Sequence, residues 1–212
     1  MEFHRLRHAR ESFWWFLQAV YMIIGFPCAV FIGFISALMA PSLIKEGAYS
    51  TLFFFSMIWL GVIIPVLMIF FKSRARLKMI NRIMGVVRSR EFFNPVEENE
   101  MKRGRGHYFG IDDKNGTILY VDRIRKGLVD VVGLTMGDWT RRELEGNTLR
   151  LFTKFPELPC IEMKTPRAQR WYDMLGAMEY KHYSTPKPFP EYIRDHVAQL
   201  ERENQIHIPR LA

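Results

Sequence analysis

The sequence LFFFSMIWLGVIIPVLMIFF occupies residues 52–71 and contains no charged side chain. It is followed at once by KSRARLKMINRIMGVVRSR, residues 72–90, which contains seven Lys and Arg residues and no acidic one. A helix of about 20 apolar residues is long enough to cross the hydrocarbon core of a bilayer. Because basic residues collect on the cytoplasmic side of such helices, residues 52–71 predict a membrane span whose C-terminal end faces the cytoplasm.

A second uncharged stretch precedes this span. Residues 13–43 form 31 consecutive positions without charge, and the connection over 44–51 is short and contains Gly47. The region 13–71 is therefore predicted to be a two-span transmembrane helical hairpin. The basic N-terminal segment 1–12 contains three Arg and predicts that both chain termini are cytoplasmic. A cleavable signal peptide is the competing interpretation, and the length of the apolar run argues against it.

Small side chains recur along the first predicted span at every fourth position, at Gly25, Ala29, Gly33 and Ala37. That spacing places them on one helix face, where two backbones can approach closely. We expect this helix-packing face to receive the second span, since a short connection makes the two helices neighbours. A seam between two copies of the chain, in a homo-oligomer, is the alternative.

The segment 72–90 has two interpretations, which the sequence leaves open. Leu77, Ile80, Met84 and Val87 recur at helical spacing, with basic residues between them. They fit either an amphipathic helix lying on the anionic inner leaflet or a helix that continues the second span. In both cases the basic residues are expected to contact membrane lipids and to set the topology. These membrane-surface residues are Lys72, Arg74, Arg76, Lys78, Arg82, Arg88 and Arg90.

The formal net charge of +8 lies almost entirely in this juxtamembrane segment. Residues 91–212 contain 19 basic and 19 acidic side chains, and this part of the chain is therefore neutral overall. A nucleic-acid-binding domain would concentrate basic charge on itself, because neutralising phosphates supplies most of its affinity. The charge distribution thus favours a membrane surface as partner and argues against direct contact with nucleic acid.

Beyond a linker at 91–106, the chain is predicted to form a small β-rich cytoplasmic domain over 107–183. Asn115-Gly116 separates two runs rich in β-branched and aromatic residues, which favours a tight hairpin with positive φ at both positions. Pro166 opens a packing helix, and residues 184–212 form a proline-rich turn and a last helix. The predicted strands cover 107–112, 117–122, 127–133, 139–145, 148–153 and 160–164.

The fold class is therefore α+β, with an N-terminal transmembrane helical hairpin, a small β-rich domain and C-terminal helices. Six short strands followed by one packing helix resemble the pleckstrin-homology-like superfold. That superfold hosts binding modules more often than enzymes.

The residues that carry most enzyme chemistry do not form recognisable sets in this sequence. The two cysteines, Cys28 and Cys160, lie in segments predicted to be far apart, and the six His show no metal-ligand spacing. His107 precedes Asp112 and Asp113 by a few residues, which in a strand and turn usually gives solvated neighbours. We therefore expect no catalytic residues, no metal, no cofactor and no enzymatic activity.

The plan of the chain, together with four short phrases, is similar to the entry-exclusion (surface-exclusion, ExcA-type) proteins of I-complex conjugative plasmids. The phrases are YFGID (108–112), ILYV (118–121), LPCI (158–161) and PKPFP (186–190). The resemblance implies a multi-pass protein of the bacterial inner membrane that blocks redundant plasmid transfer into a cell already carrying the plasmid. It also implies a transfer-apparatus membrane protein of the donor as partner. A membrane-tethered adaptor whose domain binds a lipid headgroup or a peptide is the alternative function.

Overall fold

The computed structural model describes residues 20–45, 47–104, 106–125 and 127–209. The predicted basic N-terminus, residues 1–12, and the first seven positions of the first predicted span, residues 13–19, lie outside the described residues. The chain divides into two compact units, Met1–Lys72 and Ser73–Ala212.

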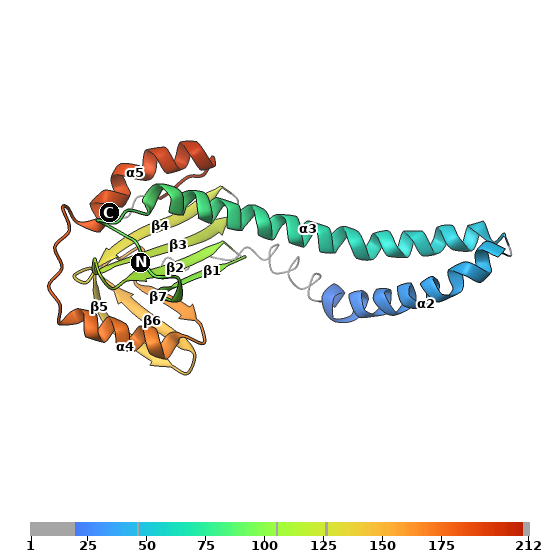
Figure 1. Cartoon of the computed structure of the whole chain (residues 1–212), viewed down its shortest axis with the longest axis horizontal. Helices are drawn as coiled ribbons and strands as arrows, with labels where there is room; N and C mark the ends of the chain where they lie inside the picture. The colour runs from blue at the N-terminus through green and yellow to red at the C-terminus, as the bar shows by residue number, and fades with distance from the viewer. Residues whose placement is uncertain (1–19, 46, 105, 126, 210–212) are drawn as a thin grey trace. The chain divides into compact units, whose positions relative to one another are not determined.

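The first unit consists of helical segments (Figure 1). A π-helical turn, η1 (Tyr21–Gly25), leads into α2 (Phe26–Lys45), and α3 (Tyr49–Val87) follows after a short connection. The π-turn is closed by the backbone N–H of Phe26, which donates to the carbonyl of Tyr21. Pro27 follows two residues after the end of this turn and has no N–H to continue an ordinary helical ladder, and π-bulges often lie next to such breaks.

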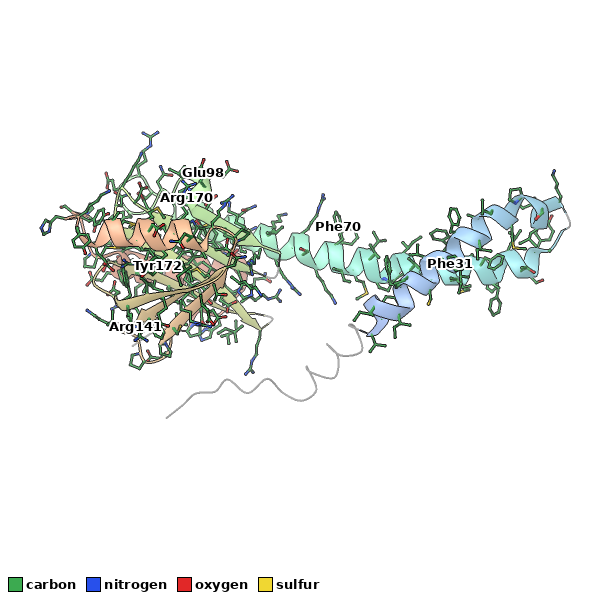
Figure 2. The ribbon with its side chains drawn as sticks, turned by 90° about the horizontal axis from the view of Figure 1, so that it is seen from below. Phe31, Phe70, Glu98, Arg141, Arg170 and Tyr172 are labelled. Carbon is green, nitrogen blue, oxygen red and sulfur yellow. The ribbon has the colours of Figure 1, made fainter. Side chains whose placement is uncertain are left out.

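Both helices are long and apolar enough to cross a membrane. The stretches Ile23–Lys45 and Tyr49–Val87 contain windows with mean hydropathies of 2.3 and 2.6. Within those windows 11% and 6% of the residues are buried in the protein, whereas the core helix of a soluble protein is mostly buried. Figure 2 shows their side chains, Phe31 and Phe70 among them, projecting outward from the ribbons. Such an apolar exterior matches a hydrocarbon surrounding rather than water.

The helix α3 continues without a break through most of the basic segment, as far as Val87, which is the course that the second interpretation of this segment describes. The apolar side chains on its last turns, at Ile80, Ile83, Met84 and Val87, are buried in a protein core. This face therefore packs within the core of the second unit, which begins at Ser73. Leu77, which belongs to the predicted stripe, is half-buried.

The second unit contains two antiparallel sheets. The first sheet has the order β1-β2-β3-β4 and the second the order β5-β6-β7. The strands of the first are β1 (Glu100–Arg103), β2 (His107–Asp112), β3 (Thr117–Arg125) and β4 (Leu128–Thr135). Those of the second are β5 (Trp139–Glu145), β6 (Thr148–Thr153) and β7 (Cys160–Lys164), followed by the helices α4 (Ala168–Glu179) and α5 (Phe189–Asn204).

The segment 91–106, predicted to be a linker, instead belongs to the folded unit. It contains the 3-10 turn η2 (Glu97–Asn99) and β1, which pairs with β2 in the register Glu100↔Gly110 to Arg103↔His107. Phe93 is fully buried and stacks near the ring of Phe189, with centroids 5.5 Å apart. Long-range packing of one aromatic side chain thus orders a stretch whose local composition is that of a loop.

The first sheet is the middle layer of the unit, because its alternate side chains enter two different cores. Tyr108, Leu119 and Val131 face the last turns of α3 and the helix α5. Their neighbours Phe109 and Ile118 face the second sheet and α4, where Trp171 is fully buried. Strand side chains alternate between faces, which explains why β2 is buried at nearly every position.

The hairpin between β2 and β3 differs in detail from the prediction. The two strands close at the pair Asp112↔Thr117, so the loop has four residues, and Gly116 alone of the predicted dipeptide has a positive φ, of 68°. The Asp112 carboxylate organises the loop by accepting the backbone N–H groups of Lys114 at 3.0 Å and Asn94 at 2.7 Å. A four-residue loop of this kind needs one left-handed residue rather than two, and glycine supplies it.

Candidate functional site

A basic cleft is the most distinctive surface feature of the second unit. It has a volume of about 370 Å³ and is open to solvent. The helix α3 contributes Arg76, Lys78 and Arg82, and Arg123 comes from the end of β3. The remaining lining residues are Ala75, Met79, Gly127, Asn204, Gln205 and Ile206. Among these described residues none is acidic, so the cleft gathers four cationic side chains without a carboxylate.

The local structure explains why these groups converge. The apolar face of α3 is held in the core, which turns the basic residues on its other faces to the surface beside the β3–β4 turn. Gln205 ends α5 in the left-handed conformation, with φ 51° and ψ 45°. The chain then runs back to the sheet, where His207 and Leu128 form a parallel bridge. This return segment forms the third wall of the cleft.

Charge repulsion is present in the cleft. The pKa of Arg123 is lowered from its ordinary value, first by partial burial and then by the nearby charge of Arg76. The Nε atom of Arg76 is buried and has no hydrogen-bond partner among the described residues. Arg123 uses its own Nε to donate to the carbonyl of Arg125, at 3.2 Å.

The other predicted membrane-surface residues do not join this cleft. Arg88 lies 3.1 Å from Glu100 Oε2 on β1, and the same oxygen accepts the hydroxyl of Tyr108 at 3.0 Å. Burial, followed by the negative charge of Glu100, raises the pKa of Tyr108. Arg90 and Arg74 have exposed side chains, and Lys72, also exposed, is the last residue of the first unit.

The sequence patterns do not predict that Arg123 belongs to the site. The signal is the run Arg123-Ile124-Arg125-Lys126 directly before Gly127, a basic cluster at the end of a strand and the start of a turn. Its partnership with the juxtamembrane residues depends on the packing of α3 against the sheet, which no local pattern records.

The predicted helix-packing residues occupy different environments. Gly33 is buried and faces the indole of Trp59 on α3, where an added Cβ would lie 3.1 Å from Cζ2. The indole Nε1 donates to Ser36 Oγ at 3.2 Å, and that hydroxyl donates to the carbonyl of Gly33 at 2.6 Å. Ala37 is exposed, Ala29 is half-buried, and Gly25 faces the ring of Tyr21 on its own helical segment. The structure thus places Gly33 against the second helix.

Titratable groups of the kind used in catalysis are dispersed. Among the described residues there is no group of three or more His, Cys, Asp and Glu side chains that fits a metal ion. His107 pairs with Asp122 Oδ1 on the neighbouring strand, at 2.7 Å, rather than with the acids of the following turn. Cys160 is half-buried, and burial raises the pKa of its thiol, which lowers its reactivity at neutral pH.

The structure is that of an α+β protein, with two helices long and apolar enough to cross a membrane in its first unit and a basic cleft in its second. The whole chain, residues 1–212, matches the model of a family described as Exclusion-determining protein. The chain belongs to this family, which implies a role in plasmid or surface exclusion and is not an enzymatic family. No curated protein and no solved structure matches it.

Proposed function

We propose that this protein is an inner-membrane exclusion protein that blocks redundant conjugative plasmid transfer into a cell already carrying the plasmid. The observation that carries the proposal is the family match, which covers residues 1–212. The protein acts by recognising a partner protein rather than by chemistry, and the partner is a transfer-apparatus membrane protein of the donor.

The membrane tether in this proposal is the pair α2 and α3. Its support is the length and hydropathy of the two helices and their exposed apolar side chains. The seven basic residues of 72–90 favour a cytoplasmic position for the second unit. Fusions of alkaline phosphatase to the C-terminus test this orientation: we expect no phosphatase activity, and an active fusion contradicts the orientation. A fusion at Ala48, between the helices, is the matched control and is expected to be active.

The recognition surface in this proposal lies on the second unit. In the proposed orientation the connection between Lys45 and Tyr49 offers a partner a very small periplasmic surface. The second unit, by contrast, carries nearly all of the charged side chains of the protein, which supply specificity at interfaces.

We further propose that the two sheets and α4 form a pleckstrin-homology-like barrel. Four antiparallel strands, three antiparallel strands and a helix after the last strand follow one another in that order. The shared core of the two sheets, capped by Trp171 and Leu175 of α4, supports the same architecture. In this protein the outer face of the first sheet is covered by α3 and α5, which leaves less of that sheet free for ligands.

A mating assay tests the exclusion function. Plasmid-free recipients express this protein alone, and donors carry either the plasmid that encodes it or an unrelated conjugative plasmid. We expect transfer to fall many-fold for the matching donor and to stay unchanged for the unrelated one. Equal transfer from the matching donor, with the protein detected in the recipient membrane, contradicts the proposal.

A second candidate function, a membrane-tethered adaptor, is favoured by the basic cleft. An adaptor of this kind holds an anionic headgroup or an acidic peptide and needs no donor. It predicts ligand binding by the isolated protein in the absence of any conjugative plasmid, which the mating assay does not measure.

A further inference from the structure

We infer that the basic cleft formed by Arg76, Lys78, Arg82 and Arg123 binds a phosphate ester. This is a ligand site in addition to the exclusion function, and its test is independent of any mating experiment.

The first argument is the imbalance of charge at the cleft. Elsewhere in the second unit, several Lys and Arg side chains form ion pairs with carboxylates. Such pairs are Arg88–Glu100, Lys102–Glu100, Arg141–Glu143, Arg142–Glu179, Arg150–Glu145, Arg170–Glu98 and Lys187–Asp195. The cleft, in contrast, holds four cationic side chains, and none of the described residues lining it is acidic.

The second argument is energetic. Burial and the charge of Arg76 lower the pKa of Arg123, which means that the guanidinium cation is less stable at this position than it is in water. Gathering like charges in a partly buried place is unfavourable unless an opposite charge offsets it. A bound dianion or monoanion removes this repulsion, so the cleft is arranged for an anionic occupant.

The third argument is the chemistry of the side chains. Three of the four cationic residues that line the cleft, Arg76, Arg82 and Arg123, carry guanidinium groups. The guanidinium fork matches the oxygens of a phosphate, which it can bind through two parallel hydrogen bonds.

The fourth argument is size. A volume of about 370 Å³ lies near the lower end of the range for small-molecule sites, which is roughly 300–1,000 Å³. Gly127 leaves its side of the cleft open, since no atom lies within 4 Å of where its Cβ would be. The space suits a compact polar group such as phosphoglycerol, whereas a folded peptide segment needs a longer groove.

Two sources supply this chemistry: the headgroup of an anionic phospholipid and a soluble phosphate ester. Arg76 follows Phe71, the last residue of the apolar run, by five positions. A lipid headgroup is therefore within reach of the cleft in the proposed membrane orientation, while a soluble ester reaches it from the cytoplasm.

The experiment uses the purified full chain in a neutral detergent. Dioleoyl phosphatidylglycerol, dioleoyl phosphatidylcholine and glycerol 3-phosphate are added separately. Bound lipid is counted by native mass spectrometry, and the thermal unfolding midpoint is recorded with each probe. We expect phosphatidylglycerol to bind at least ~10-fold more tightly than phosphatidylcholine, because charge-assisted hydrogen bonds to phosphate replace repulsion in the cleft.

The glycerol 3-phosphate arm separates the two sources. Stabilisation by phosphatidylglycerol that glycerol 3-phosphate does not reproduce identifies a lipid site. Equal stabilisation by the soluble ester identifies a cytoplasmic metabolite site, and the inference of a phosphate ester stands in both cases. If neither anionic probe binds better than phosphatidylcholine, the inference is overturned.

Variants tie the binding to the cleft. The double variant Arg76→Gln/Arg123→Gln is expected to lose the preference for phosphatidylglycerol and, without ligand, to unfold at the same or a higher temperature, because the repulsion is relieved. The control Arg141→Gln/Arg170→Gln removes the same charge from exposed side chains on β5 and α4 (Figure 2) and is expected to keep the preference.

A second cleft variant guards against a folding defect in the first. Lys78 and Arg82 have exposed side chains, so Lys78→Gln/Arg82→Gln is expected to fold and to bind phosphatidylglycerol at least ~3-fold more weakly, as charge-assisted contacts are lost. An equal loss of binding in the control variant would mean nonspecific attraction to net charge, and it would overturn the assignment of the cleft.

Discussion

Arg88 Nη2, one residue beyond the end of α3, lies 3.1 Å from Glu100 Oε2 on β1. This ion pair links the residue that follows α3 to β1, the edge strand of the first sheet. Glu100 is 10% exposed at its side chain and also receives the hydroxyl of the buried Tyr108. A residue predicted to set membrane topology is therefore part of the fold of the second unit.

Replacing Tyr108 with phenylalanine removes one donor from this nearly buried carboxylate. We expect Tyr108→Phe to lower the free energy of unfolding by about 1.5–3 kcal/mol, the usual range for a hydrogen bond to a charged group. Urea unfolding of the detergent-solubilised protein measures the change. Tyr180→Phe is the matched control, since the Tyr180 side chain is 89% exposed, and a comparable loss there would contradict the role of Glu100.

The same tyrosine makes stability dependent on alkaline pH. Its pKa is raised above the ordinary value of 10.0, so above pH 10 the phenol ionises in the unfolded chain while the folded one keeps its proton. The stabilising contribution is complete below pH 10, and above it the unfolding free energy falls by about 1.4 kcal/mol per pH unit. Unfolding between pH 9 and 11 is expected to show a shallower decline in Tyr108→Phe, and parallel declines would refute the assignment.

Two glycines in hairpin turns allow the cost of a left-handed backbone conformation to be measured separately from the cost of a steric clash. Gly116 has a φ of 68° and an added Cβ would overlap the ring of Tyr183, whereas Gly146 has a φ of 55° and open space around it. We expect Gly146→Ala to cost about 1–2 kcal/mol through the left-handed conformation. Gly116→Ala is expected to cost about 1–3 kcal/mol more, because the ring must move. Equal midpoints of thermal unfolding for the two variants would rule out the steric conflict.

The contact between Gly33 and Trp59 is testable in the helical unit. A β-branched side chain at position 33 pushes the indole away and breaks its hydrogen bond to Ser36, which we expect to cost about 1–3 kcal/mol of hairpin stability. The protein has five tryptophans, so fluorotryptophan labelling gives one fluorine resonance for each. Gly33→Val should shift the Trp59 resonance, which Trp59→Phe identifies.

The control for that experiment is Gly61→Val. No atom lies within 4 Å of a Cβ at position 61, so the Trp59 resonance is expected to keep its position in this variant. A shift of the same size in both variants would show that the resonance reports general disturbance of the helices rather than the contact with Gly33.

Much of the fold follows from local patterns in the sequence. Alternating and β-branched runs predict the six strands from β2 to β7 to within a few residues, and Pro166 and Pro190 mark the starts of α4 and α5. Local patterns do not predict the strand β1, because its sequence Glu-Met-Lys-Arg has neither alternating apolar residues nor β-branched ones. It becomes a strand through pairing with β2 and through the contacts of Glu100, which are long-range.

The candidate site is only partly visible in the sequence for the same reason. Arg76, Lys78 and Arg82 stand out as a basic run after an apolar one, and the pattern indicates an anionic partner. That pattern does not distinguish them from Arg88, whose guanidinium is paired with Glu100. Nor does it associate them with Arg123, whose position in the cleft depends on how the sheet packs against α3. Charge composition therefore predicts the class of partner, and tertiary contacts decide which residues bind it.

The core that Ile80 and Val87 share with residues of α5 has a consequence for biosynthesis. Roughly 110 residues separate Val87 from Leu200, which shares its core, and at ~5–20 residues per second the ribosome needs roughly 5–20 s to synthesise them. Throughout that interval the core around the last turns of α3 lacks the side chains that α5 contributes to it. A full-length chain completes this core once α5 has been made, whereas a chain that terminates early leaves it incomplete. The order of elements along the chain thus makes the last helix the final step in closing the core.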